Sequence, residues 1–222
     1  MSAAVKMSSA GQMLATTLRD PAIMKARKFI YEFEEGDGKD KMLLGGKGAN
    51  LCEMTQIGLN VPPGFTITTE ACLAYLERNQ LPEGLMEDIK ARIKALQTAR
   101  GQGGGSDDDP LLVSVRSGSA MSMPGMMDTI LNLGLNKATL AGLIKLTGNP
   151  RFGYDAWRRF IQLFGKIALN VDDRHFDEAM HAMKRKVGAA QDIALRAEHR
   201  SELADQFAKI IETRTGKPFP ED

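Results

Sequence analysis

Apolar residues recur at helical spacing in the last third of this chain, and this pattern constrains its fold most strongly. From Trp157 onward they mark one face of a helix, and Asn149 followed by Pro150 is typical of a helix start. A second such stripe follows, for which Ser201 is the expected N-cap. We therefore expect helices over 135–215, with both stripes facing the core. The stripe residues are Trp157, Phe160, Ile161, Phe164, Ile167 and Ala168, then Leu203, Phe207, Ile210 and Ile211.

The preceding part of the chain mixes short strand patterns with short helix patterns. Strands are expected at 28–33, 111–115 and 129–133, the second of them as a buried strand. Helices are expected after the glycine run at 45–48, after Thr69 as a cap, and from Leu85. The prediction is an α+β fold in three regions. These regions are a disordered leader at 1–25, an α+β part at 26–134, and a helical subdomain with a return segment at 135–222.

The charge balance excludes several classes of protein. The chain has 222 residues, with 29 Lys and Arg against 28 Asp and Glu, which gives a net charge of +1. A near-neutral chain is not typical of a nucleic-acid binder. Because no stretch approaches the ~18 apolar residues of a membrane span, no membrane partner is expected. Two cysteines do not form a disulfide framework, so we expect a cytoplasmic protein.

Other polar clusters predict no chemistry. The glycines of 101–110 lack the dinucleotide-binding spacing, and this segment has the composition of a linker whose aspartates lie in a solvated turn. The basic residues of 151–159 and 184–186 are expected on solvated helix faces. The three histidines share no helix face, so no metal site is expected.

The first candidate site is the run Gly45, Gly46, Lys47 and Gly48. A strand followed by a glycine turn and a helix N-terminus presents backbone N–H groups to an anion, and Lys47 adds a positive charge. The spacing is not that of a Walker A loop. An ordinary tight turn with an exposed lysine remains the alternative.

The second candidate site is Arg116, at the end of an expected strand and before a loop rich in Gly, Ser and Met. A guanidinium at this place is suited to bidentate binding of phosphate oxygens. The Met-rich loop that follows is suited to an adaptable apolar lid. The alternative is a hydrophobic hairpin turn with a structural arginine.

Three long blocks, taken together, resemble the amino-terminal part of the pyruvate phosphate dikinase family. They are LLGGKGANLCEMTQIGLNVPPGFTITTEAC at 43–72, DPLLVSVRSGSAMSMPGMMDTILNLGLN at 109–136 and GNPRFGYDAWRRFIQLFG at 148–165. Phosphoenolpyruvate synthases are similar in the first block, whereas the second favours the dikinases. The resemblance runs from about Phe29 to the end of the chain.

The resemblance implies a fold and a reaction. The family converts ATP, phosphate and pyruvate to AMP, diphosphate and phosphoenolpyruvate, with Mg2+ and a phosphohistidine carrier. Its first domain is ATP-grasp-like, with a helical subdomain that matches 136–215. The implied ATP-binding residues are Lys47 and Arg116 on the phosphates, Gly125 and Thr129 in a closing loop, and Gly45 and Gly46 in the turn. Lys47 and Arg116 are also the implied catalytic residues.

The resemblance also implies what the chain lacks. The family's Mg2+ ligands, carrier histidine and pyruvate-binding barrel are expected beyond Asp222. The chain is therefore expected to be a monomeric part of such an enzyme and to be inactive by itself. Its partners would be a nucleotide and the remaining dikinase domains. Ser119 and Ala120 depart from the Ala-Arg of many relatives. The alternative is a truncated, non-catalytic interaction module that docks through the stripe at 157–168.

Overall fold

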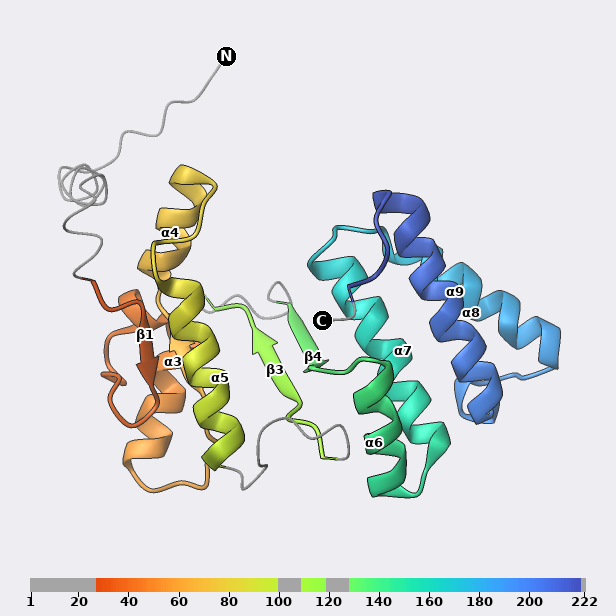
Figure 1. The fold of residues 1–222 in the computed structure, drawn as a ribbon, viewed down its shortest axis with the longest axis horizontal. Coiled ribbons are helices and arrows are strands. Elements are labelled where there is room, and N and C mark those ends of the chain that lie inside the picture. Colours follow the sequence, from red (N-terminus) through yellow and green to blue (C-terminus); the bar gives the residue numbers. More distant parts are fainter. Residues whose placement is uncertain (1–26, 100–108, 119–127, 221–222) are drawn as a thin grey trace, which may run out of the picture. The chain divides into compact units, whose positions relative to one another are not determined.

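The computed structural model describes residues 27–99, 109–118 and 128–220. The chain forms two compact units: of the described residues, the first comprises 27–96 and Gly118, and the second comprises 97–99, 109–117 and 128–220. Helices and strands occur in both, as expected for an α+β protein (Figure 1). The strands around Arg116 belong to the second unit, because they pack with each other and with the helices that follow them.

A short antiparallel strand pair organises the first unit. Its elements are β1 (Ile30–Glu32), α3 (Lys41–Gln56), β2 (Phe65–Ile67), α4 (Thr69–Arg78) and α5 (Leu85–Ala99). Tyr31 of β1 lies opposite Thr66 of β2. The two faces of β1 contribute to different clusters, because successive strand residues point to opposite sides. Ile30 packs with α4 and α5, and Tyr31 packs against the buried residues of α3.

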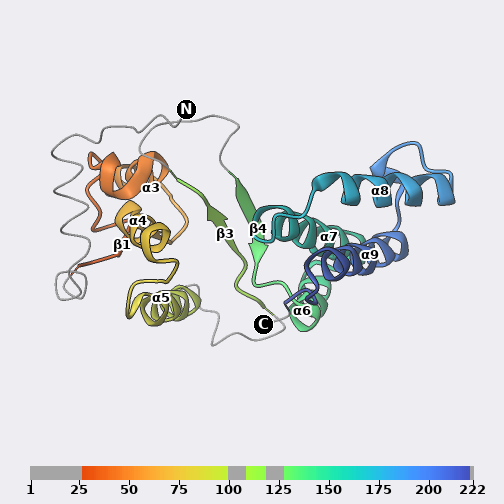
Figure 2. The ribbon, with the colours of Figure 1, turned by 90° about the horizontal axis from the view of Figure 1, so that it is seen from above.

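A second antiparallel pair and four α-helices form the second unit. Its elements are β3 (Val113–Arg116), β4 (Thr129–Leu133), α6 (Lys137–Thr147), α7 (Pro150–Ile167), α8 (Asp173–Val187), the 3-10 helix η1 (Asp192–Ala194) and α9 (Ala197–Thr215). Helix α7 packs against α6, α9 and β4, and Figure 2 shows these elements from above. Helix α8 packs mainly on α9.

Polar caps define where these helices begin and end. The Asn149 side chain accepts a hydrogen bond from the Phe152 N–H, with Pro150 in the first turn, which confirms the expected start of α7. Asp172 caps α8 in the same way, and Gly188 ends it in the left-handed conformation. Helix α9 begins at Ala197, so the expected cap at Ser201 is wrong. The backbone N–H of Arg196 instead donates to Nδ1 of His199.

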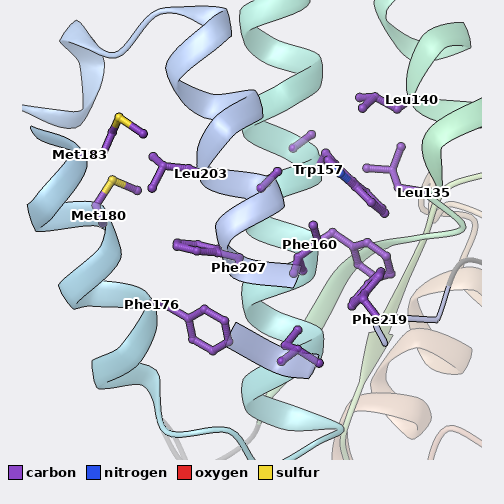
Figure 3. Packing of buried hydrophobic residues seen from close by; sticks show 14 of the residues in the cluster. Leu135, Leu140, Trp157, Phe160, Phe176, Met180, Met183, Leu203, Phe207 and Phe219 are labelled. Carbon is purple, nitrogen blue, oxygen red and sulfur yellow. The ribbon is translucent and has the colours of Figure 1, made fainter. Parts of the chain in front are cut away.

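The apolar stripes of α7 and α9 form the core of the second unit (Figure 3). Trp157, Phe160 and Ile161 are buried, as are Leu203 and Phe207. Both stripes therefore face the core, as predicted, and the buried side chains of α7 do not offer the docking surface of the interaction-module alternative.

The segment after α9 returns to the core through Phe219. Its ring makes edge contacts with Trp157, Phe160 and Phe164, at centroid distances of 5.6, 5.7 and 5.5 Å. Such edge-to-face pairs add to the gain from apolar burial. The packing of Phe219 thus holds the segment after α9, the expected return segment, against the core of the second unit.

A buried ionic network joins α7, α9 and η1. Asp155 pairs with Arg158 at 2.9 Å and with Arg200, whose Nη2 also donates to the Asp192 carbonyl at 2.6 Å. Arg158 and Arg200 are only 5% and 3% exposed, so the expectation that Arg158 lies on a solvated face is wrong. Arg158 is buried because Asp155 and Gln162 accept its hydrogen bonds and its guanidinium lies over the Phe207 ring.

Two further sequence expectations need correction. Strand β3 is mostly exposed rather than buried, since Ser114, Val115 and Arg116 are all exposed and the helices cover only part of the hairpin. Helix α4 is capped by Thr68, whose hydroxyl accepts from the Ala71 N–H, so Thr69 is its first residue and not its cap. None of the described helices is both long enough and apolar enough to cross a membrane.

Candidate functional site

The glycine run interrupts helix α3. Gly45 has φ 68° and ψ 162°, a backbone conformation that is essentially restricted to glycine. The helix therefore consists of a first turn from Lys41 and a longer part that begins after Gly45. This places a glycine turn before a helix N-terminus, as predicted. The expected strand does not lead directly into it, because β1 ends at Glu32 and turns separate the two.

The turn before Gly45 is fixed from two sides. Asp40 accepts a hydrogen bond from the Leu43 N–H at 2.9 Å. On the other side, the Thr69 hydroxyl donates to the Met42 carbonyl at 2.5 Å. Leu44 is buried between them in the small core of α3. The sequence predicted no function for Asp40 and only a helix cap for Thr69, and no pattern links Met42 to Thr69 across 27 positions.

The part of α3 after Gly45 lies close to β2. A Cβ atom at Gly48 would stand 2.7 Å from Cγ2 of Thr66, so any larger residue there would force Thr66 or the helix to shift. Lys47 is partly buried in the same turn. A lysine next to a helix N-terminus is suited to binding a phosphate, because the ammonium group and the backbone N–H groups favour the same negative charge.

Cys52 lies in helix α3 after the Gly45 turn, and its surroundings are not those of a catalytic nucleophile. The side chain is buried next to Gly36, and burial raises the pKa of its thiol. A thiol with a raised pKa stays protonated at neutral pH and behaves as a small apolar group. The cluster of Phe33, Leu44, Ala49 and Cys52 thus supports the turn from its apolar side.

The second candidate site lies at the end of the β3–β4 hairpin. Arg116 pairs across the hairpin with Thr129, and Val115 pairs with Ile130. Ile130 packs on the core of α7, so Arg116 and Thr129 lie on the opposite face. Arg116 is exposed, and no described side chain pairs with its guanidinium. An exposed arginine beside a threonine hydroxyl is suited to binding phosphate oxygens.

Two hydrogen bonds join the two strands of the hairpin next to Arg116. Ser117 donates to the Asp128 carbonyl twice, from its backbone N–H at 3.1 Å and from its hydroxyl at 2.9 Å. Further along, the register shifts by one residue, with Asn132 at φ 59°, so β4 carries a bulge. The bulge and the contact of Ile130 with the core fix the hairpin, and with it the backbone at Arg116.

The predicted site residues thus lie in both units. Gly45, Gly46 and Lys47 belong to the first unit, whereas Arg116 and Thr129 belong to the second. Gly125 lies outside the described residues. The residues of each group lie close together within their own unit. A single site made of both groups stays a prediction.

Other titratable groups form no further centre among the described residues. No group of three or more His, Cys, Asp or Glu side chains in these segments is suited to hold a metal ion. His175 contacts Arg214, and His199 accepts from the backbone of Arg196. Both histidines therefore have a hydrogen-bond partner within the second unit.

Part of the chain, including the first candidate site, matches a known protein family in sequence. Residues 41–102 match the sequence model of a family described as "Pyruvate phosphate dikinase, AMP/ATP-binding domain". The matched segment contains Gly45, Gly46 and Lys47, and it ends before Arg116 and Thr129.

Individual relatives match over most of the chain. The pyruvate, phosphate dikinase of Entamoeba histolytica is 55% identical over 194 residues, which are 87% of this chain and 22% of that protein. That of Clostridium symbiosum is 47% identical over 197 residues, 88% of this chain and 22% of the relative. The chloroplastic pyruvate, phosphate dikinase 1 of Arabidopsis thaliana is 43% identical over 214 residues, with 94% and 22% coverage. The chain spans about a fifth of the length of these curated relatives.

Proposed function

We propose that this chain binds the phosphates of ATP as part of a pyruvate phosphate dikinase, since most of the chain is similar in sequence to such enzymes and residues 41–102 match their AMP/ATP-binding domain. One observation carries the proposal. The segment that matches the AMP/ATP-binding domain contains the turn at Gly45, where a glycine-only conformation opens a helix N-terminus beside Lys47.

Lys47 and Arg116 have complementary functions in this proposal. Lys47 supplies a point charge at a helix N-terminus, and Arg116 supplies a planar fork of donors from an exposed strand end. Phosphoryl transfer depends on positioning and on stabilising the charge of phosphate oxygens. Thr129, across from Arg116, adds a hydroxyl donor at the same strand end. Gly125 belongs to the loop proposed to close over the nucleotide.

The proposal extends to the fold and the whole reaction. The two units would be parts of an ATP-grasp-like nucleotide-binding domain. The complete protein would convert ATP, phosphate and pyruvate to AMP, diphosphate and phosphoenolpyruvate by means of a histidine carrier in another domain. The described residues do not provide a site that fits Mg2+, so its ligands would come from the rest of the domain. We expect this chain alone to bind nucleotide weakly and to transfer no phosphate.

Location and assembly are part of the same proposal. Both cysteines are free, which agrees with a reducing, cytoplasmic setting. We propose that this part of the protein is a monomer, and static light scattering of the purified chain measures that directly.

Calorimetric titration of the chain with ATP tests the proposed function. Lys47→Met removes one charged contact to phosphate and should weaken binding about tenfold or more. Lys90→Met is the matched control, because Lys90 is an exposed lysine on helix α5 of the same unit. Binding that is equal in all three proteins would refute the function assigned to Lys47, and absence of ATP binding by the unmodified chain would refute the proposal for this chain.

A further inference from the structure

Three threonines in one short segment contact both sides of the Gly45 turn and the start of α4. Thr66 lies against Gly48, after the turn, where a Cβ would be 2.7 Å from its Cγ2. Thr69 donates its hydroxyl to the Met42 carbonyl, before the turn, at 2.5 Å. Thr68 caps α4 through the Ala71 N–H at 3.3 Å. The segment 66–69 therefore touches α3 on both sides of its interruption.

This segment is itself firmly held. Thr66 pairs with Tyr31 in the strand ladder, and the Thr68 N–H donates to the Phe29 carbonyl at 2.9 Å. Thr68 is 1% exposed. A contact from this segment therefore links the Gly45 turn to a fixed part of the first unit.

The hydroxyl of Thr69 is not needed by its own helix. Thr68 already caps α4, and among the described residues the Thr69 hydroxyl has one partner, the Met42 carbonyl. Met42 stands three residues ahead of Gly45, in the turn that Asp40 holds from its other end. Loss of the Thr69 hydroxyl would leave this turn held by Asp40 and by the burial of Leu44.

We propose that Thr69 is a positioning residue, which fixes the Gly45 turn through the Met42 carbonyl and so places Lys47 and the backbone N–H groups of 46–48 for phosphate. This inference rests on the proposed function, because it assigns Thr69 a part in the binding of ATP. Thr69 acts through the turn and needs no contact with the nucleotide.

Thr69→Val tests the inference, because valine keeps the shape of threonine and removes its donor. We expect ATP affinity to fall about fivefold, as the loss of one neutral hydrogen bond predicts, and Thr69→Ser to stay within about twofold of the unmodified chain. Thr55→Val is the matched control. The Thr55 hydroxyl also donates to a carbonyl, that of Leu51 at 2.9 Å, and it lies in α3 away from the turn. Its ATP affinity should stay unchanged.

A double-mutant cycle with Lys47→Met separates positioning from a general loss of structure. If Thr69 acts by placing Lys47, then Thr69→Val should cost little further affinity once Lys47 is methionine. A purely structural effect would reduce affinity by the same factor in both backgrounds. Circular dichroism checks folding, and Thr69→Ala replaces the valine variant in the cycle if that variant does not fold.

The outcomes are distinguishable. Fivefold weakening with serine rescue and a non-additive cycle supports the inference. Unchanged affinity of Thr69→Val, or a fully additive cycle, overturns it and leaves the proposed function intact if Lys47→Met still weakens ATP binding. If the unmodified chain binds no ATP, both the proposed function and this inference fail.

Discussion

Arg116 and Thr129 are cross-strand partners at the end of the β3–β4 hairpin. Directly opposite residues of an antiparallel pair present their side chains on one face. Here that face is the one away from the α7 core, because Ile130, the next residue of β4, packs on the core. A guanidinium and a hydroxyl from two segments of the chain are thereby brought together at a strand end that faces away from the α7 core.

Arg116→Ala should weaken ATP binding about tenfold, because a hydrogen-bonded contact to a charged phosphate is removed. Stability should stay unchanged, since Arg116 is exposed and pairs with no described side chain. Arg185→Ala, at an exposed arginine of α8, is the matched control. Calorimetry with ATP measures the difference, and equal affinities of the two variants would argue against a phosphate contact at Arg116.

Gly45→Ala should reduce both stability and ATP binding. Alanine is strained at φ 68° and ψ 162°, and the expected loss is about 2 kcal/mol of unfolding free energy. Gly188→Ala is the control, because Gly188 also has a positive φ, 69°, but only ends helix α8. It should cost about 1 kcal/mol and leave ATP affinity unchanged. Urea unfolding and ATP titration of both variants test this, and normal ATP binding by folded Gly45→Ala would count against the turn as the phosphate site.

Phe219→Ala should destabilise the second unit by about 3 kcal/mol, because the buried ring contacts three aromatic rings of α7. Phe152→Ala is the control, at a phenylalanine of the same helix bundle that is 50% exposed. It should cost under about 1 kcal/mol. Chemical denaturation followed by Trp157 fluorescence reports on this unit, and similar midpoints for the two variants would show that the return segment does not stabilise the core.

Asp155 should make the stability of the second unit depend on pH. Burial favours its neutral form, but the hydrogen bond from Arg158 and the charges of Arg158, Arg200 and Arg159 outweigh this and lower its pKa. Because the folded pKa is below the unfolded one, the stabilisation is present above about pH 5 and is lost as the pH falls toward the folded pKa.

Asp155→Asn should therefore lower stability at pH 7 by about 3 kcal/mol, since it leaves buried arginines without their carboxylate, and it should flatten the loss of stability in acid. Asp205→Asn is the control, because Asp205 is an exposed aspartate of helix α9 in the same unit. Unfolding midpoints between pH 3 and pH 7 give the comparison. An Asp155→Asn variant as stable and as acid-sensitive as the unmodified chain would contradict the network's contribution.

The sequence predicted those features that depend on residues close together in the chain. The period of α7, its start at Asn149 and strand β4 follow from local patterns, and the structure confirms them. The glycines at 45–48 likewise predicted a turn before a helix. A local pattern contains no information about which distant group holds that turn, so the bond from Thr69 to Met42 was missed.

Burial of charged residues was equally hard to predict. Arg158 looks like a surface residue in the sequence, because arginine is usually exposed. It is buried because Asp155 and Gln162 lie within a turn of it and because Phe207 of another helix covers its guanidinium. The exposure of β3 was missed for the opposite reason, since a β-branched segment resembles a core strand whether or not helices cover it.

We propose that the Gly45–Gly48 turn and the Arg116–Thr129 strand end both bind phosphates of ATP, as the family resemblance implies. An ATP titration of the isotope-labelled chain, followed by backbone amide NMR, tests it most directly. The amide signals of Gly46, Lys47, Arg116 and Thr129 are expected to shift together on addition of ATP, with one dissociation constant. Adenosine, which lacks phosphates, should leave them in place. Shifts confined to one of the two segments, or different dissociation constants for the two, would contradict the claim.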